Sequence, residues 1–239
     1  MADLENQKAE RARDVRRMFG AIAGRYDFLN HFLSLHIDRI WRRICVQEVS
    51  RRLHSPHPQI LDIGCGTGDL SLAFASSGSV VGCDFSHPML RVGCAKVGAR
   101  AAPNPVWLIE ADALMLPFAL GQFDAAVSAF VLRNLADARR GIEEMRRILR
   151  PGGILAVLDF SMPRIPVIGR LYRFYFLRIL PRLGTWISGV EGPYKYLPDS
   201  VQAFPGPLEL KALIESAGFQ NVEYRLLSGG IAVLLLAHA

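Results

Sequence analysis

A glycine-rich turn stands between a short apolar strand and a helix early in the chain, and it limits the possible folds more than any other segment. Residues 59–63 have the pattern of a buried strand, Gly64-Cys65-Gly66-Thr67-Gly68 follow, and a helix is predicted at 69–76. Glycines in such a turn adopt positive φ and let the backbone approach a ligand closely. The helix N-terminus behind them favours an anionic group. The segment therefore predicts a small-molecule site at the carboxyl end of the first strand.

Short apolar segments and helical segments alternate from residue 59 to residue 160. Further strands are predicted at 79–83, 106–110, 123–128 and 154–160, and helices at 88–97 and 136–149. Strands of about five apolar residues that alternate with helices are typical of a parallel sheet buried on both faces. With right-handed crossovers this is an α/β, Rossmann-like, doubly wound sheet, which binds ligands outside the carboxyl ends of its strands.

The flanking segments predict one domain that covers residues 1–239. Residues 1–55 form a helical N-terminal extension, and residues 56–160 form the ligand-binding core. Residues 161–206 break the alternation with several prolines and an aromatic stretch, and they are too long for an ordinary connection, so we expect a substrate lid. Residues 207–239 add a helix at 208–217 and a hairpin of strands at 222–227 and 231–236. The sheet would then be mostly parallel, with seven strands.

Charge and cysteine usage limit the classes of partner. The net charge is +6, with 24 Arg against 4 Lys, which is compatible with a nucleic acid, an acidic membrane surface or an anionic ligand. No RNA-binding signature accompanies these arginines, so solvated helix faces are the simpler interpretation and no nucleic acid is expected. The four cysteines and six histidines match neither a zinc module nor a disulfide framework, so we expect no metal.

The apolar segments are short. The longest run, Ile231 to Ala237, is far too short to span a bilayer, and the N-terminus lacks the apolar core of a signal peptide. We therefore expect a cytoplasmic protein, at most peripheral to the inner face of the cell membrane.

Acidic residues stand at the ends of three successive predicted strands. Asp62 precedes the first glycine, Asp84 ends the second strand, and Asp112 follows the third. A carboxylate at the second strand end can accept both hydroxyls of a ribose. One after the third strand can accept from an adenine amine. Together with Gly64 and Gly66, these acids suit a nucleoside that carries a positively charged sulfonium, which is S-adenosylmethionine.

A nicotinamide-dependent dehydrogenase is the main alternative for a glycine-rich turn. Its usual spacing is Gly-x-Gly-x-x-Gly, whereas this turn reads Gly-x-Gly-x-Gly. The Tyr-x-x-x-Lys pair of short-chain dehydrogenases is also absent, because Leu4, Val92, Glu191 and Pro207 stand four residues before the four lysines. The methyltransferase interpretation is therefore preferred.

Two resemblances extend this interpretation. Residues 59–160 resemble the class I S-adenosylmethionine-dependent methyltransferases. Segments outside the glycine loop resemble the menaquinone and ubiquinone biosynthesis C-methyltransferases, in order along most of the chain. These segments are 15–30 (VRRMFGAIAGRYDFLN), 34–43, 128–135 (SAFVLRNL), 192–205 (GPYKYLPDSVQAFP), 217–219 and 228–231. The chain differs from the usual family pattern at His36 and Asp38, and at Val131, where the family usually has glycine.

The resemblance implies C-methylation of a prenylated quinol ring, with demethylmenaquinol as the first expectation and a ubiquinol precursor as the alternative. Cofactor contacts would fall on Thr67, Asp84, Asp112, Ala113 and Ser128.

Arg133 is the candidate that stabilises developing oxyanion charge, because it is a permanent cation with planar donors, and Asn134 could orient the same oxygen. Tyr26, Asn30, Tyr194 and Tyr196 are candidate residues of the substrate pocket. Each has a structural alternative: Arg133 could pair with a carboxylate, and the tyrosines could simply pack.

Three further expectations concern the lid and the partners. At uniform α-helical spacing, Arg170, Arg173, Arg178 and Arg182 do not gather on one face, which favours a lid with an apolar inner side over an interfacial helix. Peripheral membrane contact is expected from the prenylated substrate alone, and a homodimer is compatible with the sequence. A small-molecule or rRNA methyltransferase of the same fold, and a non-enzymatic cofactor-binding scaffold, remain as alternatives.

Overall fold

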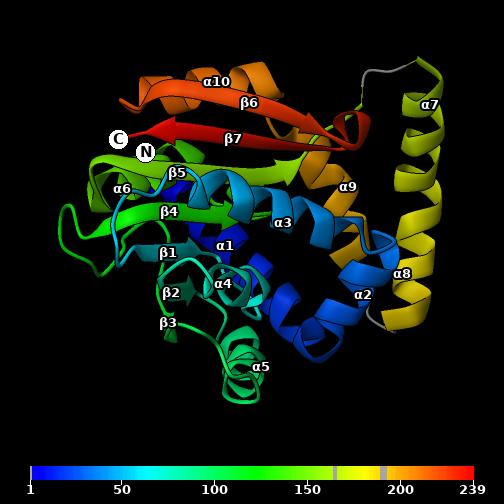
Figure 1. Ribbon diagram of the computed structural model, residues 1–239. Coiled ribbons are helices and arrows are strands. Elements are labelled where there is room, and N and C mark those ends of the chain that lie inside the picture. The colour runs from blue at the N-terminus through cyan, green and yellow to red at the C-terminus, as the bar shows by residue number, and fades with distance from the viewer. Residues whose placement is uncertain (1, 164–165, 189–192) are drawn as a thin grey trace.

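The computed structural model describes residues 2–163, 166–188 and 193–239, which form a seven-stranded sheet with helices on both faces (Figure 1). The strand order is β3-β2-β1-β4-β5-β7-β6, and only β7 runs antiparallel to its neighbours. The strands are β1 (Gln59–Ile63), β2 (Ser79–Asp84), β3 (Val106–Glu110), β4 (Phe123–Ala129), β5 (Leu149–Phe160), β6 (Gln220–Leu227) and β7 (Ala232–His238). The predicted Rossmann-like fold class is confirmed.

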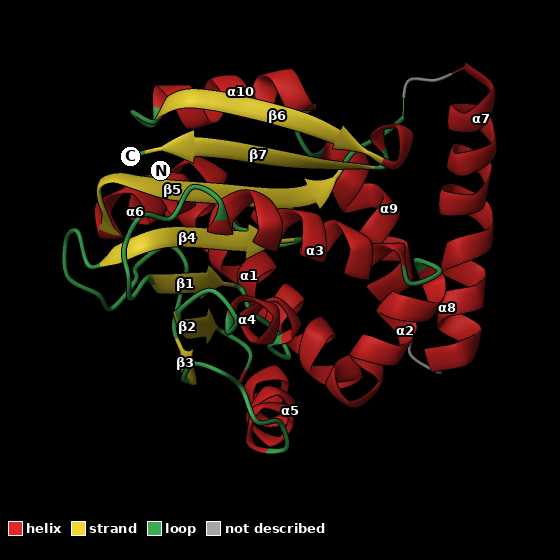
Figure 2. Ribbon diagram, viewed as in Figure 1, coloured by secondary structure: helices red, strands yellow, loops and turns green. Residues whose placement is uncertain are grey.

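The core helices alternate with the strands, as the apolar periodicity predicts (Figure 2). They are α4 (Asp69–Phe74), α5 (His87–Gly98), α6 (Ala138–Ile148) and α10 (Pro207–Ser216). Asp137 caps α6, because its side chain accepts a hydrogen bond from the backbone N–H of Arg140. The helix therefore begins two residues later than predicted.

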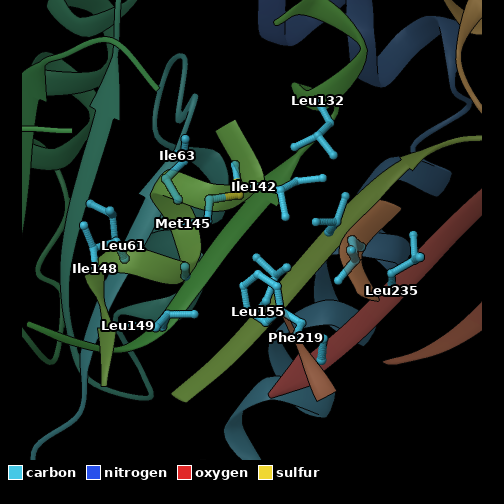
Figure 3. Packing of buried hydrophobic residues seen from close by; sticks show 14 of the residues in the cluster. Leu61, Ile63, Leu132, Ile142, Met145, Ile148, Leu149, Leu155, Phe219 and Leu235 are labelled. Carbon is cyan, nitrogen blue, oxygen red and sulfur yellow. The ribbon is translucent and has the colours of Figure 1, made fainter. Parts of the chain in front are cut away.

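Two hydrophobic clusters lie on the two faces of the sheet. On one face, α6 and α10 pack on the central strands, and Figure 3 shows Ile142, Met145 and Ile148 of α6 near Leu61 and Leu155. On the other face the cluster includes residues of α3 (Ile37–Ser50) and α4. Because both faces are covered, β1 and β4 are buried along most of their length, and their carboxyl ends are where ligands can reach the sheet.

The N-terminal extension is helical, as predicted, but it bends twice. Helix α1 (Ala2–Ile22) passes through a 3₁₀ turn at Ala23–Arg25 into α2 (Tyr26–Leu33), and α3 follows after a tight turn. Leu35 and His36 in that turn have φ of 52° and 62°, a conformation that bulky residues seldom adopt. Neither is glycine or proline, so the sequence did not mark this break.

The predicted lid is helical over its described residues. Helix α7 (Pro166–Phe174) continues through a π-helical turn (Tyr175–Ile179) into α8 (Leu180–Ser188), and α9 (Pro193–Ala203) follows. Figure 1 shows α7 and α8 stacked along one side of the molecule, with α2 and α9 on their inner side. Leu29 and Leu33 of α2 are buried in one cluster with Phe176, Leu180 and Val201. The lid therefore stands beside the carboxyl ends of β4 and β5.

Candidate active site

The glycine turn after β1 has the conformation that its sequence predicts. Gly64 and Gly66 have φ of 68° and 55°, and the backbone N–H groups of Gly64 and Cys65 both donate to the carbonyl of Cys83. A Cβ added to Gly64 would lie 2.4 Å from Cγ2 of Val131, so the two segments are in close contact. Only glycine fits at this position, for reasons of both conformation and space.

Asp84, at the end of β2, fixes the turn. One carboxylate oxygen accepts from the backbone N–H of Gly66 at 2.9 Å, and the other accepts from that of Ser86 at 2.8 Å. Burial raises the pKa of Asp84, against the lowering effect of these hydrogen bonds. A carboxylate held in this way has lone pairs left for ribose hydroxyls.

A cavity of about 110 Å³ lies beside this turn, and we call it the glycine-loop cavity. Five of the predicted cofactor residues line it: Gly64, Gly66, Asp84, Asp112 and Ala113. The remaining wall comes mainly from α1, the segment after β2 and the segment after β4. Residues that follow β1, β2 and β3 thus meet at one cavity, as expected for a ligand site at the carboxyl ends of parallel strands.

Three other predicted cofactor residues do not line this cavity. Asp62 is buried and accepts a 2.6 Å hydrogen bond from Ser71, and Ser128 donates at 3.0 Å to the carbonyl of Ile63. The hydroxyl of Thr67 donates to Asp27 and accepts from Lys96. The hydrogen bonds of Asp62 and Ser128 hold the turn and its flanking elements, so direct cofactor contact by these three residues stays a prediction.

A second cavity, of about 260 Å³, lies between α2, α3, the end of β4 and the lid helices, and we call it the lid cavity. Phe19, Tyr26 and Phe130 line both cavities and so separate them. The predicted residues Tyr26, Asn30, Tyr196 and Arg133 all line the lid cavity, while the lid contributes apolar and aromatic side chains that include Tyr172, Phe176 and Leu180. An elongated apolar molecule with a polar head suits this lining.

The polar groups gather at the wall that the cavities share. Burial raises the pKa of the Tyr26 phenol, although a hydrogen bond with Asn30 and the charges of Arg133 and Arg42 act in the opposite direction. The guanidinium of Arg42 lies 5.4 Å from the centre of the Phe130 ring. At neutral pH, Tyr26 is therefore a hydrogen-bond donor beside two cations.

Arg133 does pair with a carboxylate. Its Nη1 donates to Oδ1 of Asp159 at 2.7 Å, both side chains are almost fully buried, and Arg133 also lies over the Phe160 ring at 5.2 Å. This pairing leaves Nε of Arg133 and Oδ2 of Asp159 without a hydrogen-bond partner, and the buried hydroxyl of Tyr196 also lacks one. Unsatisfied donors on a cavity wall are groups that a bound ligand or water can satisfy.

Asn134 does not line the lid cavity. Asn134 lines the glycine-loop cavity rather than the lid cavity; its amide donates to the carbonyl of Phe130, and its Oδ1 is buried without a partner. Its catalytic role stays a prediction, and its position suits cofactor contact better. Tyr194 falls outside the residues whose side chains the structure describes.

No sequence pattern marked a chain of charged groups that runs from the helix after the glycine turn to the lid cavity. Lys96 contacts Asp27, Asp69 and the hydroxyl of Thr67, and Nε2 of His31 lies 3.3 Å from Asp69.

The same network continues to the lid cavity. Nδ1 of His31 lies 2.8 Å from Oδ2 of Asp38, which also contacts Arg42, and Ser34 donates to Oδ1 at 2.7 Å. Burial acts to raise the pKa of Asp38, but the hydrogen bond from Ser34 and the charge of Arg42 outweigh it and lower that pKa. Asp38 is thus an ionised group on the lid-cavity wall.

The described residues hold neither a cluster of metal ligands nor a membrane-spanning helix. No group of three His, Cys, Asp or Glu side chains among them is placed to hold a metal ion. No helix in the described ranges is long and apolar enough to cross a bilayer.

The glycine-loop cavity fits S-adenosylmethionine by its own chemistry. It offers a carboxylate at Asp84, another at Asp112, and an unsatisfied buried oxygen on Asn134. It also has backbone exposed by two glycines at positive φ. These are acceptors for hydroxyl and amine groups, and a negative environment for a cation.

The comparisons with known proteins agree with this geometry. Residues 2–238 match the model of the ubiE/COQ5 methyltransferase family. The chain is 47% identical to the demethylmenaquinone methyltransferase of Thermus thermophilus over 91% of this chain and 97% of that protein. It is 42% identical to a ubiquinone/menaquinone biosynthesis C-methyltransferase, UbiE, of Geotalea daltonii over 94% of this chain and 96% of that protein.

Solved structures agree on the fold. An S-adenosylmethionine-dependent methyltransferase from Aquifex aeolicus has a TM-score of 0.59 at 18% identity, covering 80% of this chain and 87% of that one. Such a likeness shows the fold alone, whereas the relatives and the family model cover nearly the whole chain. The chain is therefore a methyltransferase that belongs to the ubiE/COQ5 methyltransferase family.

Proposed function

We propose that this enzyme transfers a methyl group from S-adenosylmethionine to a ring carbon of a prenylated quinol, with demethylmenaquinol as the principal substrate. The observation that carries the proposal is the shared wall of Phe19, Tyr26 and Phe130. It separates a cavity with acidic strand ends from an apolar cavity with a polar end. A cofactor and a long apolar substrate can therefore approach each other at one point.

The two cavities suggest how each molecule is oriented. Gly64, Gly66, Asp84, Asp112 and Asn134 would hold S-adenosylmethionine, which supplies an electrophilic methyl group on a sulfonium. The quinol ring would lie at the shared wall, and its prenyl tail would extend along the apolar side chains of the lid. Holding the ring carbon in line with the methyl group removes much of the entropic barrier to transfer.

Arg133 and Tyr26 would act on the quinol oxygen. The ring carbon becomes nucleophilic when an adjacent hydroxyl loses or shares its proton, and negative charge then develops on that oxygen. Arg133 is a buried cation with an unsatisfied Nε, and Tyr26 is a protonated phenol near it. Donors already aimed at a developing charge stabilise the transition state without reorganisation.

Asp38 and Arg42 would position this end of the cavity. Asp38 holds Arg42, whose guanidinium lies over Phe130, and it is the one carboxylate among the described residues that line the lid cavity. An ionised carboxylate there can accept a hydrogen bond from the second quinol hydroxyl. Formation of the new carbon–carbon bond would break the bond between the methyl group and the sulfonium and leave S-adenosylhomocysteine as the product. The ring carbon would then give its hydrogen as a proton to water, which restores the aromatic ring.

The preference for a naphthoquinol is supported by the relatives. The Thermus thermophilus protein is named a demethylmenaquinone methyltransferase, and so is a Deinococcus radiodurans relative that is 42% identical. Other relatives are named for both ubiquinone and menaquinone biosynthesis. C-methylation of a ubiquinol precursor is therefore the second substrate to test.

The test is a transfer assay with methyl-labelled S-adenosylmethionine. Purified protein is given reduced demethylmenaquinone, the reduced demethylated ubiquinone precursor and rRNA in parallel. Label on the naphthoquinol supports the principal proposal, and label on both quinols makes the enzyme bifunctional. Label on rRNA alone, or cofactor binding without label on either quinol, would overturn the quinol assignment. The oxidised quinones serve as controls, because without ring hydroxyls they should not be methylated.

A further inference from the structure

The lid helices carry an unusual charge composition. Residues 161–190 contain five arginines and no Asp, Glu or Lys. The rest of the chain mixes acids and bases, so the local excess of positive charge is greatest here. Within the described part, Arg173, Arg178 and Arg182 are all exposed.

The same helices expose large apolar side chains on their solvent side. Phe174, Ile179 and Trp186 are 61%, 42% and 82% exposed. On the inner side, Phe176 and Leu180 are almost fully buried and line the lid cavity. The helix thus has an apolar inner face and an outer face that mixes arginines with aromatic and aliphatic groups.

The π-helical turn explains why uniform helical spacing did not reveal this outer face. A π turn contains more residues than an α turn, so it shifts the phase of every residue that follows it. This turn, Tyr175–Ile179, lies between Arg173 and Arg182. Arg173, Arg178 and Arg182, which uniform α-helical spacing would spread around the helix, are all exposed in the structure.

The entrance of the lid cavity lies near this face. Leu35, in the turn after α2, lines the cavity and is 75% exposed, so the cavity reaches the surface there. Helix α2 packs against α8, and the hydroxyl of Tyr175 donates to the carbonyl of Leu33 at 2.9 Å. A surface bound to the outer side of α7 and α8 would therefore lie beside the cavity entrance.

We propose that the solvent side of α7 and α8 docks on the anionic surface of a lipid bilayer. Arginines pair with lipid phosphates, and Trp and Phe side chains insert at the boundary between headgroups and acyl chains. A second copy of this chain is a poorer occupant, because a two-fold contact would set arginines against arginines. Exposed Ile179 and Phe174 add to the contact with a bilayer but offer nothing to the phosphates of an RNA.

The proposal is tested by sedimenting the full-length protein with vesicles, without quinol or cofactor. One set of vesicles is pure phosphatidylcholine, and the other contains phosphatidylglycerol as well. We expect binding to the anionic vesicles that falls with added salt. The double variant Arg178→Glu/Arg182→Glu should lose roughly tenfold or more in partition, since each basic residue near an anionic surface contributes appreciably to binding.

A control variant with the same change in total charge distinguishes an effect of this surface from an effect of the protein's net charge. Arg91→Glu/Arg100→Glu makes the same change in total charge at exposed sites in and just after α5, which Figure 1 shows well away from α7 and α8. It should retain most of the binding. Trp186→Ala should weaken binding to both kinds of vesicle without changing the salt dependence. Unfolding curves verify that each variant is folded.

Three outcomes would overturn the proposal. These are wild-type-like binding by the Arg178→Glu/Arg182→Glu variant, equal loss in the α5 control, and no binding of the wild-type protein to the anionic vesicles. Because no substrate is present, a negative result leaves the proposed methyl transfer untouched.

Discussion

Nη1 of Arg133 lies 2.7 Å from Oδ1 of Asp159, and the exposed fractions of their side chains are 5% and 0%. Arg133 follows β4 and Asp159 lies near the end of the neighbouring strand β5, so the pair joins two strand ends beneath the lid cavity. Removal of one member of a buried pair leaves an uncompensated charge. This relationship makes Arg133 both a structural residue and a candidate catalytic residue, and the two roles need separate tests.

The structural role is tested with Asp159→Asn. The variant leaves the Arg133 charge buried without its counter-ion, so the free energy of unfolding should fall by roughly 3–5 kcal/mol. Urea unfolding followed by circular dichroism measures the change. Glu143→Gln breaks the 2.9 Å pair with Arg139, in which both side chains are about half exposed, and it should change stability little. Equal effects of the two substitutions would contradict the importance of the buried pair.

The catalytic role is tested with the double variant Arg133→Gln/Asp159→Asn. The two neutral amides can still form a hydrogen bond, so the fold is expected to survive. Loss of the cation should lower kcat for quinol methylation by roughly 10²–10³-fold, the usual effect of removing one oxyanion donor. The affinity for S-adenosylmethionine, measured by calorimetry, should stay near the wild-type value. A folded variant with undiminished kcat would exclude Arg133 from the reaction.

The close contact between Gly64 and Val131 predicts that a side chain at position 64 clashes with Val131, and that a smaller residue at position 131 relieves the clash. In Gly64→Ala the new methyl group meets Val131 and the residue keeps a positive φ, so both cofactor affinity and stability should fall. The double variant Gly64→Ala/Val131→Gly should recover the stability that the clash with Val131 costs. Only the backbone strain of a non-glycine residue at positive φ, about 1–2 kcal/mol, should remain. Gly98→Ala is the control, because its Cβ meets nothing within 4 Å. No recovery in the double variant would show that the contact with Val131 is unimportant.

Asp62 predicts a pH dependence of stability. Burial raises its pKa from 3.8 to about 7, although the hydrogen bond from Ser71 lowers it. The folded state therefore binds the proton more tightly than the unfolded state. The contribution of Asp62 to the free energy of unfolding is greatest below the pKa that it has in the unfolded state. This contribution is lost as the pH rises toward the pKa of Asp62 in the folded state, by up to roughly 1.4 kcal/mol per pH unit.

Asp62→Asn should remove that slope. Relative to the wild type, the variant should become more stable as pH rises from about 5 to about 7, as urea unfolding at several pH values would show. Ser71→Ala removes a contact that favours the ionised form, so it should extend the slope to higher pH. Parallel curves for the wild type and Asp62→Asn would mean that Asp62 is ionised throughout.

The sheet could be predicted closely because each strand is a short apolar segment between turn residues. The predicted bounds of β1 and β3 match the structure, whereas β5 begins at Leu149 rather than at Ile154. There the strand runs through Pro151-Gly152-Gly153, residues that usually mark a turn, with Gly152 at a φ of 75° and an irregular register against β4. The positions of Asp84 and Asp112 at predicted strand ends likewise indicated that they lie beside the glycine loop, as the structure shows.

The rest of the site depends on contacts that leave no local pattern. Asp159 lies within an otherwise apolar strand, where no local pattern marks it, and its partner Arg133 is 26 residues away in the sequence. His31 and Asp38 meet only because the chain turns through two left-handed residues between them. The π-helical turn in the lid also has no proline or glycine to signal it. In each case tertiary packing, rather than periodicity, determines the position.

Whether the two cavities hold two different molecules is tested most directly by a crossed comparison of two variants. Asp84→Asn changes the glycine-loop cavity, and Leu180→Trp fills part of the lid cavity. Asp84→Asn should weaken S-adenosylmethionine binding roughly tenfold or more, the usual effect of losing a charged hydrogen bond, with little change in the quinol KM at saturating cofactor. Leu180→Trp should raise the quinol KM and leave cofactor affinity unchanged. If Leu180→Trp instead weakens cofactor binding and leaves the quinol KM unchanged, the lid cavity is not the quinol site.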